Sequence, residues 1–125
     1  MGGLFGDAKA ADLTDAQRKD LMNAVSSLMK SKPTEPPYVV KATPETILSI
    51  ARHRGVERRN PTAVYMPGGN QVFWRADRDE EQNIDLMAHE FAHAVQHRDG
   101  RPMSEAEAEW VQRKIGSFPK GRKQE

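Results

Sequence analysis

AHEFAHAVQ, residues 88–96, sets two histidines four positions apart, with a glutamate directly after the first. Residues four apart in an α-helix lie one turn apart on the same face, so the imidazoles of His89 and His93 can reach one metal ion. Glu90 lies about 100° further round the helix, where its carboxylate can reach a water on the metal without being a ligand itself. This H-E-x-x-H pattern predicts His89 and His93 as metal ligands and Glu90 as the catalytic base.

The residues around this pattern predict which side of the helix is buried. Ala88, Phe91 and Val95 fall within about 40° of Ile84 on a helical wheel, while the two histidines fall near the opposite side. We therefore expect one face to pack on a core and the other to present the ligands. Acidic residues predict the start of the helix and Gly100 predicts its end; the acidic residues are Asp77, Asp79, Glu80 and Glu81.

A catalytic zinc site usually has three protein ligands and one open position for water. The candidates for the third ligand are Glu105, Glu107 and Glu109, which follow a short turn. Glu105 and Glu109 share a helix face with the small Ala108, whereas Glu107 points away. Our choice is Glu105 as the ligand and Glu109 as the group that orients a histidine through its far ring nitrogen, with Glu109 as the rival ligand. His97, one turn beyond His93, drifts off this face and is expected to be exposed.

The rest of the chain predicts a small α+β domain around this helix. Thr14 and Gln17 fit a capping box that opens a first helix over about 14–30, and prolines make 31–37 a connector. Two short β-prone runs flank a glycine-rich turn and predict an antiparallel hairpin. The remaining expected elements are a strand at 38–40, a helix from Thr43-Pro44 to Gly55, the hairpin strands 63–66 and 71–74, and a last helix from Ser104, in capping-box register with Glu107, to just before Gly116.

Composition limits the domain organisation and the partners. With 125 residues, the chain suits one domain, which we place at 14–117 between a flexible N-terminus, 1–13, and a disordered basic tail, 118–125. A net charge of +1 does not favour nucleic acid or an anionic membrane as a partner. The chain has no cysteine, membrane span or visible signal peptide, which favours a cytoplasmic protein as written; a secreted or periplasmic mature domain would look the same.

With these motifs in place, the chain resembles the gluzincin clan of zinc metallopeptidases, especially the small single-domain minigluzincins. The resemblance covers roughly residues 60–115 and rests on AHEFAHAVQ and on Glu105-x-x-Ala108-Glu109. It implies a zincin-like fold, a Zn²⁺ ion held by His89, His93 and Glu105, and hydrolysis of a peptide or protein substrate. It also selects Glu105 over Glu109, and it implies that the edge strand of the hairpin pairs with an extended substrate.

Two departures from larger members of that clan favour an alternative function. The chain has no second subdomain to close over a cleft, and no His or Tyr follows His97 where many members place an oxyanion-stabilising residue. Tyr65, Tyr38 and Arg101 are the candidates to replace it. The alternative is a metal-binding but catalytically inactive module that binds a partner.

Overall fold

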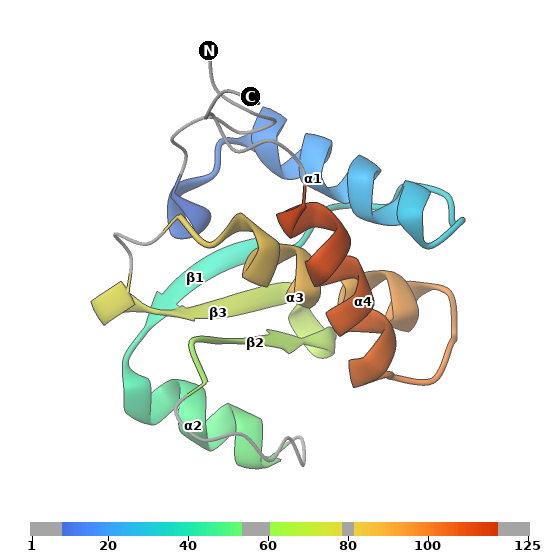
Figure 1. Cartoon of the computed structure of the whole chain (residues 1–125). Coiled ribbons are helices and arrows are strands. Elements are labelled where there is room, and N and C mark those ends of the chain that lie inside the picture. The colour runs from blue at the N-terminus through green and yellow to red at the C-terminus, as the bar shows by residue number, and fades with distance from the viewer. Residues whose placement is uncertain (1–8, 54–60, 79–81, 118–125) are drawn as a thin grey trace.

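Four helices, three short 3₁₀ turns and a three-stranded mixed sheet make up the part of the chain that the computed structural model describes, residues 9–53, 61–78 and 82–117 (Figure 1). The predicted α+β class is confirmed at this level. In chain order the main elements are α1 (Asp15–Leu28), β1 (Tyr38–Ala42), α2 (Pro44–His53), β2 (Ala63–Met66), β3 (Gln71–Arg75), α3 (Ile84–Arg98) and α4 (Glu105–Gly116).

The sheet has the order β1-β3-β2, so β3 is its central strand. β2 and β3 form the predicted antiparallel hairpin, from the pair Ala63–Trp74 to the pair Met66–Gln71. β1, for which the sequence predicted a strand but no partner, pairs with β3 in parallel, so the sheet is mixed and not the small antiparallel hairpin alone. The reason is topological: α2 and β2 lie between β1 and β3 in the chain, and this long connection lets the chain return in the same direction.

The two faces of the sheet carry different layers. Successive strand residues point to opposite faces. Tyr65 and Trp74 join the main core with residues of α1, α3 and α4, and both are fully buried. Val64 points the opposite way and is buried outside that core, as are Ile47 and Ala51 of α2, which contacts β2 and β3. The sheet therefore separates α2 from α1, α3 and α4 (Figure 1).

α3 is the central helix, and α4 packs along it (Figure 1). Every residue from Met87 to Gln96 is buried, so the face of α3 that presents the histidines is covered as well as the face that packs on the core. α4 covers the histidine face through Ala108, whose small side chain is fully buried and permits the close approach. Gly100 follows the helix with φ +71, the left-handed conformation that glycine adopts readily at a helix end.

The predicted start of α3 was too early. Residues Ala76–Arg78 form a 3₁₀ turn, and α3 begins at Ile84 with Asn83 as its N-cap residue. Asp77 is not part of the first turn of α3. Its Oδ2 instead lies 2.7 Å from Nη2 of Arg75, the last residue of β3. Trp74 adds to this turn by donating its indole N–H to the carbonyl of Arg78. Asp79, Glu80 and Glu81 lie outside the described residues.

The described part of the N-terminus packs on the domain. Ala10 and Ala11 are buried in the main core, so the predicted flexible segment 1–13 does not extend to these residues. The domain therefore includes residues before the predicted boundary at 14. The predicted tail, 118–125, and the predicted helix stop at Gly55 lie outside the described residues.

Thr14→Ala tests the helix start that the sequence predicted. Thr14 Oγ1 accepts the Gln17 backbone N–H at 3.1 Å, and Gln17 Oε1 accepts the Thr14 N–H at 2.9 Å. Losing this cap should lower the free energy of unfolding by about 1 kcal/mol. Urea unfolding in the presence of a chelator measures it. Thr34→Ala, in the connector, is the control, and equal losses in the two variants would contradict the capping role.

Candidate metal centre

His89 and His93 lie one turn apart in the buried middle of α3. The two residues are 1% and 3% exposed, and their ring centroids are 5.1 Å apart with an interplanar angle of 72°. Removing two imidazoles from water is unfavourable unless their nitrogens find polar partners. Each ring has such partners at both nitrogens, which fixes the orientation of the pair: both partners of His89 lie on α4, and those of His93 lie on α3 and α4.

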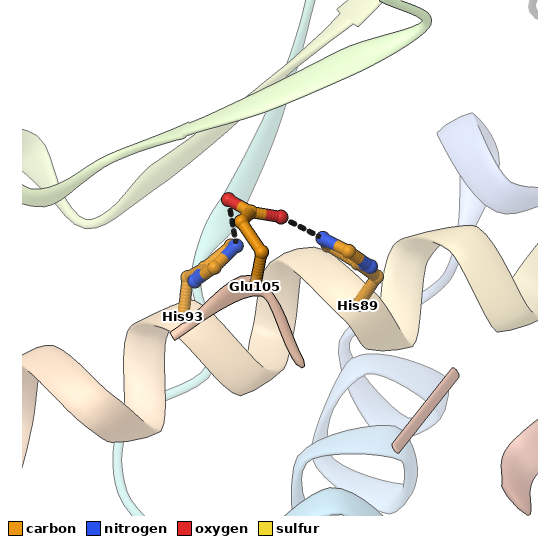
Figure 2. A group of neighbouring side chains, drawn as sticks. All are labelled: His89, His93 and Glu105. Atoms are coloured by element: carbon orange, nitrogen blue, oxygen red, sulfur yellow. Dashed lines mark hydrogen bonds and ion pairs between the residues drawn. The ribbon is translucent and has the colours of Figure 1, made fainter. Parts of the chain in front are cut away.

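Glu105, the first residue of α4, brings its carboxylate to the point where the two rings converge (Figure 2). Its Oε1 lies 2.9 Å from His89 Nε2, and its Oε2 lies 3.1 Å from His93 Nε2. Half of the Glu105 side chain is exposed, so this carboxylate is the solvent-facing side of the group. The structure thus brings together the three residues chosen from the sequence as metal ligands.

The donor set fits a small divalent cation. The ligand atoms of His89, His93 and Glu105 all lie within 4.8 Å of one another. Donors about 2.1 Å from a tetrahedral ion are about 3.4 Å apart, so the two nitrogen–oxygen distances need to grow by only a few tenths of an ångström. Two imidazoles and a carboxylate suit zinc, and three protein ligands leave one position open.

Glutamines, which the sequence analysis did not consider, hold the far side of both rings. His89 Nδ1 lies 2.9 Å from Gln112 Oε1, and His93 Nδ1 lies 2.9 Å from Gln96 Oε1. Glu109 was predicted to orient a histidine, but Gln112 and Gln96 occupy both Nδ1 positions and Glu109 is exposed. Helical spacing could have indicated both glutamines as neighbours of the ligand residues. Gln96 lies three residues after His93 on α3, and Gln112 lies seven residues, or two turns, after Glu105 on α4.

Glu90 lies beside the histidines in the same buried turn of α3. It is 3% exposed, although glutamate is rarely buried unless its charge has partners. Among the described residues, every buried side-chain nitrogen and oxygen has a hydrogen-bond partner, so this carboxylate is satisfied. Glu90 is thus a buried, partnered carboxylate directly next to His89 in the chain.

The three candidates for oxyanion stabilisation have different surroundings. Arg101 donates to Glu107 and to the carbonyl of Met29 and pairs with Asp99, which argues against it as a donor to substrate. Tyr65 is fully buried in β2, and its hydroxyl donates to Asn70 Oδ1 at 3.1 Å. Tyr38 is 54% exposed at the start of β1, with the Arg18 guanidinium over its ring.

Several other polar residues of α2 and α3 are not part of the ligand group. His97 is exposed near the end of α3, as predicted. Asp85, in the first turn of α3, approaches Gly116 at the far end of α4. Of the basic residues near the end of the second helix, Arg52 and His53 occupy its last turn, where cations are favourable.

Comparison of the chain with models of protein families, with curated proteins and with solved structures gives no significant match. In the described residues, no helix combines the length and apolar character that crossing a membrane requires.

Proposed function

We propose that this protein is a zinc-dependent peptidase with a zincin-like arrangement, in which His89, His93 and Glu105 hold the metal. The observation that carries the proposal is the convergence of two Nε2 atoms and one carboxylate from two helices, with the H-E-x-x-H pattern on the central one. The resemblance of these motifs to gluzincin peptidases supports the same conclusion. A single carboxylate that faces both Nε2 atoms supports one shared ion over a separate hydrogen-bond partner for each ring.

The chemistry follows from the donor set and from the buried glutamate. Bound here, zinc supplies a Lewis acid that polarises the scissile carbonyl and lowers the pKa of water at its open position. Glu90 accepts a proton from the attacking water and returns it to the leaving amine, so the carboxylate is regenerated in each cycle. Its burial keeps this carboxylate from being solvated by bulk water, which strengthens its interactions with charge that develops nearby.

An extended peptide is the substrate that the sheet would accept. β2 is an edge strand of the described sheet, and it precedes the site helix in the chain. Extended peptides bind such edges by main-chain pairing. Ala63, Val64 and Tyr65 are at most 3% exposed, so this edge must be uncovered before a peptide can pair with it.

The same burial favours a second candidate function, a metal-binding module without turnover. His89, His93 and Glu90 are each at most 3% exposed, and Glu105 is the member of the group that faces solvent. A site that stays closed would stabilise the domain through metal binding and leave α4 to a partner. Cleavage of a labelled unfolded protein, with and without a chelator, separates the two functions, because only the peptidase shows chelator-sensitive cleavage of the substrate.

Glu105→Gln and Glu109→Gln form a matched pair that tests the third ligand. Both glutamates lie in the first turns of α4, both are exposed, and both substitutions remove one charge. Because only Glu105 contacts the two Nε2 atoms, its variant should lose zinc affinity by at least roughly tenfold, or about 1.4 kcal/mol. Glu109→Gln should bind like the parent. Competition against a coloured chelator measures both, and the reverse order would assign the ligand to Glu109.

A further inference from the structure

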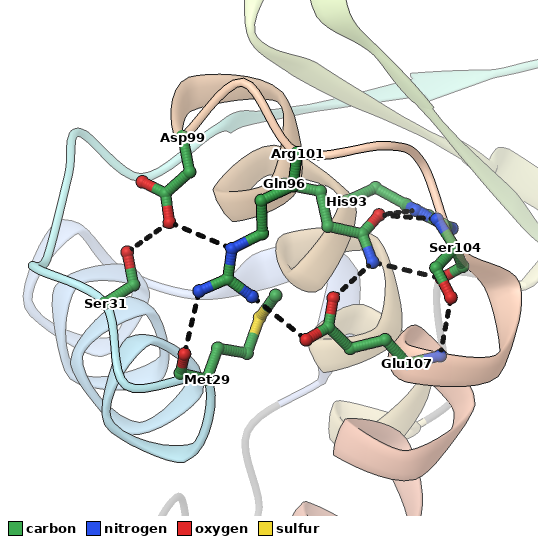
Figure 3. A network of polar contacts seen from close by, with 8 residues as sticks. All are labelled: Met29, Ser31, His93, Gln96, Asp99, Arg101, Ser104 and Glu107. Carbon is green, nitrogen blue, oxygen red and sulfur yellow. Dashed lines mark hydrogen bonds and ion pairs between the residues drawn. The ribbon is translucent and has the colours of Figure 1, made fainter.

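Gln96 forms the centre of a polar network behind His93 (Figure 3). It is fully buried, one turn after His93 on α3. Its Oε1 accepts from His93 Nδ1 at 2.9 Å and from the backbone N–H of Ser104 at 3.2 Å. Its Nε2 donates to the carbonyl of Ser104 at 3.0 Å and to Glu107 Oε1 at 2.9 Å. The amide thereby uses its two donors and two acceptor positions completely.

Three of these four bonds fix the amide without reference to the histidine. The N–H of Ser104 can only donate, so it requires an oxygen, while the Ser104 carbonyl and the Glu107 carboxylate can only accept, so they require the NH₂ group. A flipped amide would lose all three bonds inside the protein, where unpaired polar groups are costly. The atom that faces His93 Nδ1 is therefore an oxygen, and Nδ1 must carry a proton.

This proton leaves Nε2 as the nitrogen of His93 that can bind a metal. A neutral imidazole has one protonated nitrogen and one with a free lone pair, and the hydrogen bond at one nitrogen decides which is which. His93 Nε2 is also the atom that faces Glu105. The acceptor at Nδ1 and the ligand position at Nε2 thus lie on opposite sides of one ring, as a ligand histidine requires.

The network extends from Gln96 to α1 through charged groups. Glu107 Oε2 accepts from Arg101 Nη1 at 3.0 Å, and Arg101 Nη2 donates to the carbonyl of Met29 at 2.9 Å. Arg101 also pairs with Asp99, which accepts from Ser31 Oγ. These contacts tie the loop between α3 and α4 to the end of α1, so Glu107 cannot turn away from Gln96 without breaking them.

Gln112, which faces His89 Nδ1, is not held by a comparable set of bonds among the described residues. The side chain of Gln112 is half-buried, and its amide oxygen is hydrogen-bonded to His89 Nδ1. Gln112 therefore does not by itself fix which nitrogen of His89 carries the proton. Gln112 thus provides an internal comparison, because it has the same chemical group and the same distance to Nδ1 without that set of bonds.

We infer that Gln96 is a positioning residue for the metal centre: its amide, held by Ser104 and Glu107, fixes the proton of His93 on Nδ1 and directs Nε2 to the metal. This role deepens the proposed function and rests on His93 being a ligand. In this account Glu107 holds the amide of Gln96, and Arg101 holds Glu107 in place.

Gln96→Met removes the acceptor and should weaken zinc binding by about 10–100-fold, the usual cost of losing a group that orients a ligand. Gln112→Met, the matched control, should cost less. The double variant Gln96→Glu with Glu107→Gln restores an acceptor toward Nδ1 and a donor between the two side chains, but it places a carboxylate oxygen against the Ser104 carbonyl. Its affinity should therefore exceed that of Gln96→Met without reaching that of the parent. Unfolding in chelator separately records the purely structural cost.

The ring proton is read directly from nitrogen-15 spectra of zinc-loaded protein labelled at histidine. The parent should show His93 bound through Nε2 with a proton on Nδ1 that exchanges slowly, and Gln96→Met should lose that slow exchange. Parental affinity in Gln96→Met, or a parent in which His93 binds zinc through Nδ1, overturns the inference. The second result needs no variant, so the test holds even if Gln96→Met fails to fold.

The same measurements separate this inference from the proposed function. A parent that binds zinc through His93 Nε2, depends on Gln96 and cleaves no peptide refutes the peptidase and leaves the positioning role standing. A parent that cleaves peptides while Gln96→Met keeps full affinity refutes the positioning role alone. A parent that binds no zinc refutes both.

Discussion

Glu90→Gln is expected to keep its zinc and to lose peptide cleavage by a factor of about 10²–10⁴, the usual contribution of a positioned general base. Glutamine matches glutamate in size, so the buried turn of α3 keeps its packing, but an amide cannot take a proton from water. Cleavage rates of a labelled unfolded protein and zinc content, measured on the same preparation, give the result.

Glu90→Gln is diagnostic because it should separate zinc binding from peptide cleavage. Glu105→Gln should lose zinc and cleavage together, because Glu105 contacts both histidines, whereas Glu90→Gln should lose cleavage alone. Cleavage by Glu90→Gln at the parental rate would show that Glu90 is not the base. If instead the parent shows no chelator-sensitive cleavage although it binds zinc, the second candidate function, a module without turnover, is the correct one.

Sequence patterns correctly predicted those structural features that depend on residues close together in the chain. The capping box at Thr14 and Gln17 forms as expected, and the hairpin strands pair across the glycine-rich turn. Both signals come from groups within a few residues of each other, so the local sequence carries them. The parallel pairing of β1 with β3 joins segments more than thirty positions apart, and periodicity carries no information about such partners.

The same distinction applies to the candidate site. The spacing of His89 and His93 is a property of one helix, and the structure shows both rings converging on Glu105, the glutamate chosen from the next helix. The start of α3 was misplaced because Arg75, a strand residue, competes for Asp77. Gln96 was missed because its importance depends on Ser104 and Glu107, which reach it only after α4 folds back on α3.

His93→Ala is expected to remove zinc binding and the stability that depends on it. Zinc at 100 to 1,000 times its dissociation constant stabilises the parent by about 3–4 kcal/mol, and a site reduced to His89 and Glu105 should lose most of this. Thermal unfolding with zinc and with chelator gives the two values for each protein. In the parent the melting temperature should fall on chelation, and in His93→Ala the two melting curves should coincide.

The comparison within each protein is necessary because the substitution also opens a cavity in α3. Gln96 keeps its bonds to Ser104 and Glu107 when the ring is gone, so the cavity and not an unpaired amide is the main structural loss. That loss appears equally with and without zinc and cancels in the difference. His97→Ala, the same substitution one turn further along α3, should keep the full zinc-dependent shift because His97 is exposed. A zinc-dependent shift of parental size in His93→Ala would remove His93 from the ligand set, and with it the positioning role of Gln96.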